Sequence, residues 1–225
     1  MTASKLFLPS VLLASAVGLQ AAAPKTDDVL ARMKKAESDI LTLSFRFTQT
    51  ADITLTGEKQ KISGSAAFRK PDKFRIEHLS PQAQTVVSDG KTLWFYNPAR
   101  NQVLVDSWAN WTRSAGFPKG LLPYQTATDD LRERYDIVCE SEVREKKRTG
   151  AVLRLTPKES GPWTYTFRLW VDLDTGVPYR TELQTQGVNS VTDVTDVRVN
   201  PPLKESVFVF DVPKDAEILG GVPGQ

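Results

Sequence analysis

The residues of this chain that could act as acids, bases, nucleophiles or metal ligands are few. Paired carboxylates occur at Asp27-Asp28, Asp129-Asp130 and Asp172–Asp174, each at a predicted helix start or turn, where a carboxylate accepts hydrogen bonds from free backbone N–H groups. One histidine, His78, and one cysteine, Cys139, cannot form a zinc cluster or an internal disulfide. The sequence also lacks nucleophile-elbow, HExxH, P-loop and paired-cysteine motifs. We therefore expect a protein that is not an enzyme, with no catalytic residues, no metal and no cofactor.

Aromatic residues at alternate positions indicate another chemistry, the binding of an apolar ligand. Because side chains alternate between the two faces of a strand, each set of alternate residues shares one face. Such a face is ordinary core on the simplest interpretation and the wall of an apolar cavity on the alternative one. The cavity interpretation is favoured here, because a small curved sheet covered by short, proline-broken helices packs less solidly than a two-sheet sandwich. The residues that we expect to line the cavity are Phe45, Phe47, Phe68, Phe74, Ile76, Trp163, Tyr165 and Phe167.

The strands that must position these residues are organised around the stretch Thr85–Asp106. Asp89-Gly90 followed by the apolar run Thr92–Tyr96 is a hairpin signal, because glycine adopts the positive φ of tight turns. Asn97-Pro98 ends that strand, since proline cannot donate to a sheet ladder. Another strand begins at Gln102, so the stretch predicts three antiparallel strands joined by tight turns.

An amphipathic helix is predicted before the first strand. Thr26 is its expected N-cap, two aspartates follow in the first turn, and apolar residues recur at helical spacing as far as Leu41. From Leu43 the period changes to two, and strands continue to Val207–Phe210 without βαβ alternation. The predicted fold class is mainly β (α+β): an incomplete antiparallel β-barrel of about eleven strands with this N-terminal helix and a short-helix lid.

The lid is predicted where the period-two pattern breaks, between Asp106 and Arg134. Trp108 and Trp111 stand three residues apart, so one helical face can hold both. Two prolines and a glycine then prevent a long regular element, and a second short helix is predicted over Thr128–Tyr135. An insertion of this kind is expected to cover the sheet. The apolar residues expected to close on the sheet are Trp108, Trp111, Phe117, Leu121 and Leu122.

Composition and the N-terminus limit the class of protein further. With 225 residues, 40% of them hydrophobic, and a net charge of +2, the chain suits one domain with a proper core and no nucleic-acid partner. Lys5, the apolar run Leu6–Leu19 and the small residues Ala21–Ala23 have the features of a signal peptide, and the run is too short to span a membrane. We expect residues 1–23 to be this signal peptide and residues 24–225 to be one domain in the periplasm.

The stretch SDGKTLWFYNP at residues 88–98, followed by Gln102, resembles the signature of the LolA-type periplasmic lipoprotein carriers. The resemblance covers about residues 26–218, and its central motif is long enough to be fairly specific. Further matching stretches are Phe47–Thr50, the basic pair before Pro71, Leu155–Lys158 and Val207–Pro213.

The resemblance implies an incomplete barrel whose interior, under a helical lid, holds the acyl chains of a lipoprotein. It implies a monomeric soluble chaperone in the periplasm that carries acylated lipoproteins from an inner-membrane ABC-type release complex to an outer-membrane lipoprotein receptor. The family typically has an arginine before the turn proline, and that arginine hydrogen-bonds lid carbonyls. Lys70 stands at that position here, after Arg69. By strand alternation, Lys70 shares a face with Phe68 and Phe74, and Arg69 points the other way. Lys70 and Arg69 are therefore the candidate lid latch.

Other functions remain open on the sequence alone. RseB-type stress sensors carry a similar half-barrel, so the chain could be a lipid- or lipoprotein-sensing interaction module, and it could also carry another lipid or glycolipid. An enzyme acting on a lipid or glycan is least favoured, because no catalytic constellation is present. No cysteine stands near the predicted cleavage region, which favours a soluble carrier over the membrane-anchored receptor of the same fold.

Overall fold

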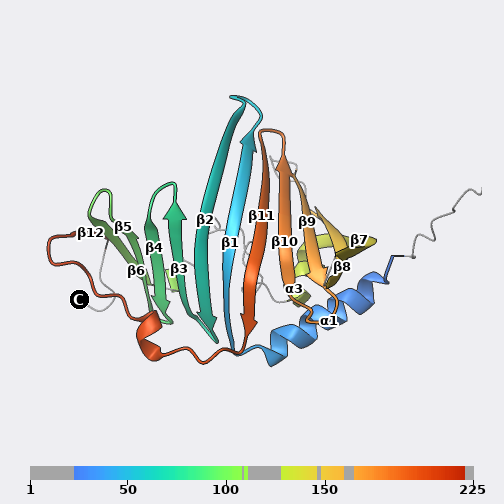
Figure 1. The fold of residues 1–225 in the computed structure, drawn as a ribbon, viewed down its shortest axis with the longest axis horizontal. Helices are drawn as coiled ribbons and strands as arrows, with labels where there is room; N and C mark the ends of the chain where they lie inside the picture. The colour runs from blue at the N-terminus through green and yellow to red at the C-terminus, as the bar shows by residue number, and fades with distance from the viewer. Residues whose placement is uncertain (1–22, 108, 111–127, 146–147, 160–164, 221–225) are drawn as a thin grey trace, which may run out of the picture.

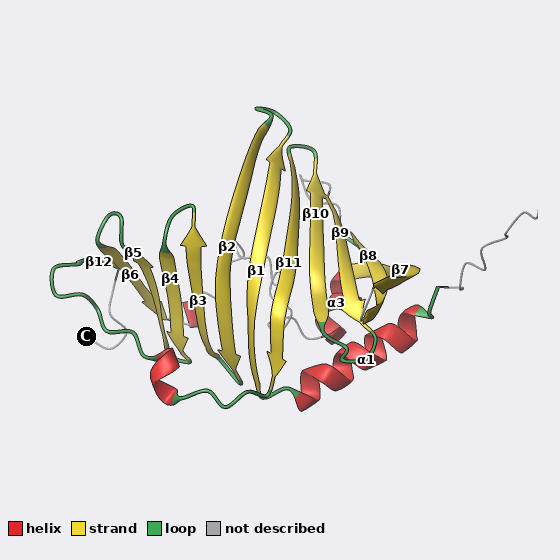
Figure 2. Ribbon diagram, in the orientation of Figure 1, coloured by secondary structure: helices red, strands yellow, loops and turns green. Residues whose placement is uncertain are grey.

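The period-two patterns of the chain fold into one open, twisted sheet (Figure 1 and Figure 2). The computed structural model describes residues 23–107, 109–110, 128–145, 148–159 and 165–220. The strands are β1 (Thr42–Ile53), β2 (Glu58–Arg69), β3 (Lys73–Ser80), β4 (Gln84–Asp89), β5 (Thr92–Asn97), β6 (Gln102–Ser107), β7 (Tyr135–Glu145), β8 (Arg148–Pro157), β9 (Tyr165–Asp172), β10 (Pro178–Thr185), β11 (Val188–Val199) and β12 (Glu217–Leu219).

Within the described residues these twelve strands are ordered β12-β6-β5-β4-β3-β2-β1-β11-β10-β9-β8-β7. The strands β1 to β11 pair antiparallel with their neighbours, and the three-residue strand β12 runs parallel to β6. The edges are β12 and β7, so the sheet does not close into a barrel. The predicted fold class, an incomplete antiparallel barrel, is confirmed; β12 was not predicted.

Two turns with an aspartate and a glycine fix the register of the hairpins. In the β4–β5 turn, the Asp89 carboxylate accepts backbone N–H groups of Lys91 and Thr92 at 2.8 Å, and Gly90 has a φ of +97°. In the β9–β10 turn, the Asp172 carboxylate accepts two N–H groups at 2.9 Å, and Gly176 has a φ of +70°. Side-chain capping of this kind satisfies the free turn amides, which is why these sequences turn.

The helix α1 (Thr26–Asp39) lies along the base of the sheet and joins its two hydrophobic clusters (Figure 1). Ala36 belongs to the first cluster, with residues of β1 to β5 such as Phe45 and Phe74. Leu30 and Met33 belong to the second cluster, with residues of β8 and β9. We call the face of the sheet that carries both clusters the inner face, and the opposite one the outer face.

The start of α1 differs from the prediction. Lys25, and not Thr26, is the N-cap, and it makes no side-chain capping bond. The Thr26 hydroxyl instead accepts the backbone N–H of Cys139 on β7 at 3.0 Å. Because β7 is an edge strand, its N–H groups lack a second strand as partner, and Thr26 supplies one acceptor. The expected aspartates, Asp27 and Asp28, do lie in the first turn.

The predicted last strand, Val207–Phe210, is wrong. The described chain forms the 3₁₀ helix η1 (Glu205–Phe208) there, within a segment that crosses the outer face. We call residues 201–216 the strap. Phe210 packs on Trp94 and Tyr96 of β5, with ring centroids 6.2 and 5.7 Å apart. The strap therefore lies against β3, β4 and β5 on the outer face and does not extend the sheet.

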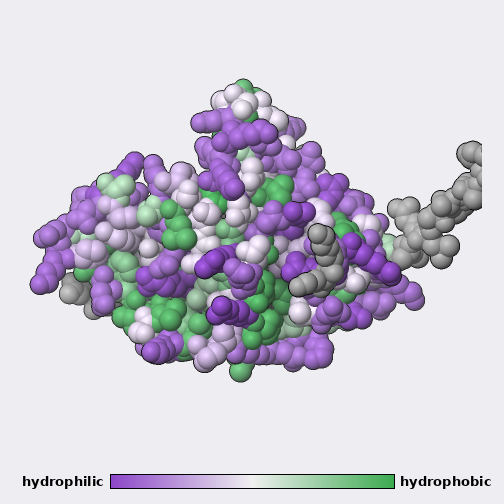
Figure 3. All heavy atoms as spheres, in the orientation of Figure 1, coloured by the Kyte–Doolittle hydropathy of each residue, from purple (hydrophilic) through white to green (hydrophobic). Residues whose placement is uncertain are grey.

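The outer face away from the strap carries several ion pairs. Arg154 of β8 and Arg168 of β9 both bond Glu140 of β7, at 2.8 and 3.0 Å, and Arg180 bonds Asp193 at 2.5 Å. Figure 3 shows this side of the molecule with hydrophilic residues around its rim and hydrophobic residues gathered in its lower middle. Among the helices of the described residues, none has the length and apolar composition of a membrane span.

Candidate functional site

The inner face of β1 to β3 is an aromatic wall. Phe45 stacks on Phe68 with ring centroids 5.8 Å apart, and Phe68 lies 6.0 Å from Phe74. These rings and Ile76 come from neighbouring strands because Phe45, Ala66 and Ile76 are aligned in register, as are Phe68 and Phe74. All four side chains are buried, and Phe74 is only 1% exposed. The period-two alternation of the strands correctly predicted that these residues share one face. They form the part of the aromatic wall that is closed to solvent.

Phe47 lies further along β1 and is half-buried. Its ring sits over Gly64 of β2, where a Cβ atom would lie 2.5 Å from Phe47 Cζ. The His78 ring meets it edge to face, with centroids 5.7 Å apart, and His78 Nδ1 is 3.4 Å from Gln84 Oε1. The Glu77 carbonyl oxygen would lie still nearer to that Cβ atom, so glycine is required both for the ring and for the backbone of β3 to approach β2 here. This end of the wall combines an apolar ring with polar groups.

A second aromatic group lies on β7 and β9. Phe167 is buried, whereas Tyr165 and Tyr135 are half-buried, and their hydroxyl oxygens are 3.0 Å apart. Burial raises the pKa of Tyr135 well above its usual range, and the bond to Tyr165 adds to this. The Tyr135 hydroxyl is thus neutral at physiological pH. The two tyrosine hydroxyls carry one proton each, and only one of these protons is needed for the hydrogen bond between them. The other can be donated to a ligand or to water.

Several predicted site residues lie outside the described residues. Trp163 of the expected wall is one of them. The others are all five expected lid residues, Trp108, Trp111, Phe117, Leu121 and Leu122. The short helix predicted next to them is present as α3 (Thr128–Arg134), and Thr128 bonds the Glu37 carboxylate of α1 through its N–H at 3.0 Å and its hydroxyl at 3.1 Å.

The two latch candidates separate to opposite faces, as alternation predicted. Lys70 donates to the backbone carbonyl of Glu37 in the last turn of α1, where a cation complements the helix dipole. Arg69 lies on the outer face and holds the strap, with bonds to the Leu203 carbonyl and, at 2.5 Å, to the Glu205 carboxylate. Arg69 therefore serves the strap, and Lys70 has a carbonyl partner on the inner side.

Sequence reasoning missed two half-buried aromatic residues of the inner face. Phe95 packs against the first cluster, and Tyr135 packs against the second. Phe95 stands two residues after Leu93 in the strand Thr92–Asn97, so the two share a face. Tyr135 likewise stands two residues before Ile137. Alternation could have placed both on the inner face.

The thiol of Cys139 is expected to react slowly. Partial burial raises the pKa of the Cys139 thiol, so less thiolate is present at pH 8 than in an unfolded chain. We expect the folded protein to react with Ellman's reagent roughly tenfold more slowly than the urea-unfolded protein. Absorbance at 412 nm measures both rates, and equal rates would contradict this assignment.

Together, the open antiparallel sheet, its apolar inner face and the helix along its base define a half-barrel protein. The chain belongs to the family described as "Outer membrane lipoprotein carrier protein LolA", whose model matches residues 38–211. The resemblance of the SDGKTLWFYNP stretch to that family is thus confirmed.

The chain is similar to proteins named as outer-membrane lipoprotein carrier proteins. The one from Glaesserella parasuis is 30% identical over 192 residues, covering 84% of each chain. The one from Pasteurella multocida is 27% identical over 191 residues, covering 85% of this chain and 86% of that protein.

Solved structures share the fold. An uncharacterised conserved protein from Thermus thermophilus matches with a TM-score of 0.57 and 16% identity, covering 86% of this chain and 97% of that one. The Pseudomonas aeruginosa MucA/MucB complex contains a chain that matches with a TM-score of 0.50 and 21% identity, covering 81% of this chain and 60% of that one. At these identities the similarity shows the fold alone.

Proposed function

We propose that this chain is a soluble periplasmic carrier that binds the acyl chains of lipoproteins at its inner face and takes them from the inner to the outer membrane. The observation that supports this most is that the inner face of a member of the LolA family carries half-buried aromatic rings on three separate strands, Phe47 on β1, Phe95 on β5 and Tyr165 on β9. Residues 1–23 are proposed as the signal peptide that directs the chain there.

The free energy of hydration explains why a carrier is needed. Burial of one methylene group contributes about 0.8 kcal/mol, so an acyl chain of ~15 methylenes opposes transfer into water by ~12 kcal/mol. A lipoprotein has more than one such chain, and its escape from a membrane into water is negligible. A protein that offers an apolar face removes most of this cost.

The closed and half-buried parts of the inner face have different roles in the proposal. Phe74 and Phe45 are packed by the protein's own side chains and support the wall. Phe47, Phe95 and Tyr165 retain exposed surface, so they are the residues proposed to contact acyl chains. The segment with Trp108 and the four other expected lid residues is proposed to cover them.

Release of the cargo must cost little, so the empty state must also be stable. We propose that the lid takes the place of acyl chains on the wall in that state and that Lys70 helps to hold the closed arrangement. The chain carries no nucleotide-binding motif, so an ABC-type release complex and an outer-membrane receptor would bias loading and unloading by their different affinities for the two states. The carrier acts as a monomer in this proposal.

A charge on the half-buried part of the wall tests the proposal. We expect Phe47→Asp to lower the yield of a detergent-free complex with a triacylated lipoprotein at least about tenfold, because a carboxylate in contact with acyl chains is poorly solvated. Gel filtration of the carrier mixed with the lipoprotein measures the complex. Phe74 is unsuitable for this experiment, because a charge at a side chain that is 1% exposed would unfold the protein.

Phe210→Asp is the matched control. Phe210 is also a half-buried phenylalanine, but it lies on the outer face against Trp94 and Tyr96. We expect this variant to form the complex as the parent does. Equal complex formation by Phe47→Asp and the parent, with circular dichroism showing both folded, would refute the inner face as the acyl-chain site.

A further inference from the structure

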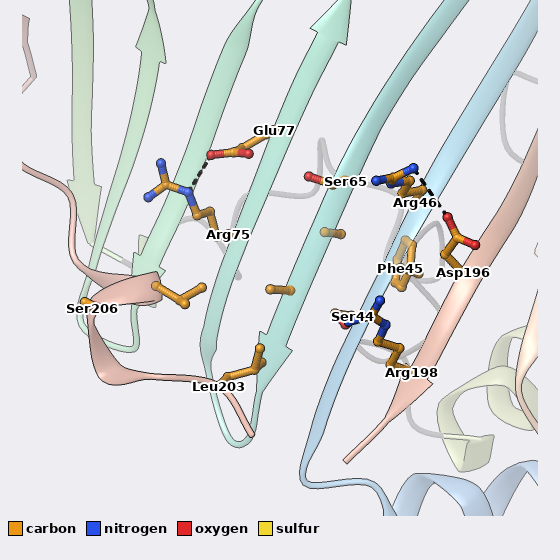
Figure 4. Close-up of a pocket in the computed structure, with 13 residues that line it drawn as sticks. Ser44, Phe45, Arg46, Ser65, Arg75, Glu77, Asp196, Arg198, Leu203 and Ser206 are labelled. Atoms are coloured by element: carbon orange, nitrogen blue, oxygen red, sulfur yellow. Dashed lines mark hydrogen bonds and ion pairs between the residues drawn. The ribbon is translucent and has the colours of Figure 1, made fainter. Parts of the chain in front are cut away.

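A groove of about 740 Å³ crosses the outer face beside the strap (Figure 4). It lies over β11, β1, β2 and β3, on the side of the sheet opposite the aromatic wall. Ligand sites commonly have volumes of roughly 300–1,000 Å³, so the groove is large enough for several residues of a peptide. None of the inner-face residues proposed to contact acyl chains lines it.

The groove owes its depth to short side chains and to the strap. Ser44, Ser65 and Ala67 form part of its lining on β1 and β2, where longer side chains would fill the space. Leu203 and Val207 of the strap stand along one side. The strap is fixed there because the Glu205 carboxylate bonds both Arg69 and Lys73. The groove is therefore a built feature of the fold.

The charges of the groove suit an acidic ligand. Arg75 stands on one side and Arg46 and Arg198 on the other, as Figure 4 shows. Arg75 pairs with Glu77 at 2.8 Å, and Arg46 is 3.6 Å from Asp196, with 75% of the Arg46 side chain exposed. The lining thus has three guanidinium groups and two carboxylates, an excess of positive charge. Guanidinium groups bind carboxylates through two parallel hydrogen bonds.

We infer that this groove is a docking site for an extended acidic peptide segment of a partner protein. Arg46, Arg75 and Arg198 would bind its carboxylates, and Glu77, Asp196 and the serine hydroxyls would accept its backbone N–H groups. A bilayer fits less well, because the two carboxylates of the groove repel a uniformly anionic surface. The inference does not depend on acyl-chain binding. Since the two sites lie on opposite faces, a partner and a cargo could be bound at once.

Fluorescence anisotropy with labelled dodecapeptides tests the inference. One peptide alternates glutamate and serine, and the other alternates lysine and serine. We expect the full chain to bind the acidic peptide and not the basic one, and Arg198→Gln to weaken that binding by about tenfold. Ser65→Phe, which fills the groove without changing its charge, should weaken binding similarly.

Arg144→Gln is the matched control, because Arg144 is an exposed arginine on β7, away from the groove. We expect it to change peptide affinity less than about twofold. Failure of the acidic peptide to bind, or equal losses from Arg144→Gln and Arg198→Gln, would overturn the inference. Binding to phosphatidylglycerol vesicles that depends on Arg198, without such dependence for the peptide, would overturn it in favour of a membrane surface.

Discussion

Replacing Phe208 by alanine is expected to lower the free energy of unfolding by about 3–5 kcal/mol. Phe208 is 1% exposed although it belongs to the strap, and the Arg69 guanidinium carbon lies 5.1 Å from its ring centroid. Removing the ring leaves a cavity against the outer face and removes the cation–π contact. Urea denaturation followed by circular dichroism measures the change.

The neighbouring residue provides the control for this prediction. Val209 is 51% exposed, so Val209→Ala should change the free energy of unfolding by less than about 1 kcal/mol. If Phe208→Ala were as stable as Val209→Ala, the strap would not be a stabilising part of the fold. It would then also be a poor wall for the outer-face groove.

Phe208 also shows where sequence reasoning went wrong. The run Val207–Phe210 alternates branched and aromatic residues and so predicts a strand. In the structure the N–H groups of Val207 and Val209 bond locally, to Lys204 and Ser206, and both phenylalanines pack against the sheet. Contacts with the outer face decide the conformation, and no local pattern reports them.

The hairpins could be predicted because their signals are local. Asp89-Gly90 and Asp172–Gly176 contain the carboxylate that caps the turn and the glycine that adopts the positive φ, within five residues or fewer. The face of each strand residue follows from period two, which is why Lys70 and Arg69 were placed correctly on opposite faces.

The degree of burial along the inner face could not be predicted from the sequence. Phe45 and Phe47 are equivalent by alternation, yet Phe45 is buried and Phe47 is only half-buried. Both residues pack in the first cluster, which brings together Ala36, Ile40 and residues of strands that are distant in sequence. Period two predicts a face, whereas contacts between elements that are distant in sequence decide how deeply each residue of that face is buried.

The position of α1 depends in turn on Gly176 in the β9–β10 turn. A Cβ atom there would lie 2.9 Å from the Arg32 carbonyl carbon and 3.0 Å from Ala36 Cβ, and nearer still to the Arg32 carbonyl oxygen. The turn and the helix are also joined by a hydrogen bond of 2.7 Å from the Arg32 guanidinium to the Leu173 carbonyl. An added methyl group must therefore displace helix backbone, which no side-chain rotation can avoid.

We expect Gly176→Ala to lower the free energy of unfolding by about 2–4 kcal/mol, the sum of strain at positive φ and the forced shift of α1. Gly57→Ala separates these contributions, because Gly57 has nearly the same φ, +68° against +70°, but no atom within 4 Å of the added Cβ. It should cost about 1 kcal/mol. Urea denaturation of both variants gives the difference, expected to be about 1–3 kcal/mol. Equal losses would mean that α1 moves away from the turn without cost, so that the close contact between Gly176 and Arg32 would not fix the position of the helix.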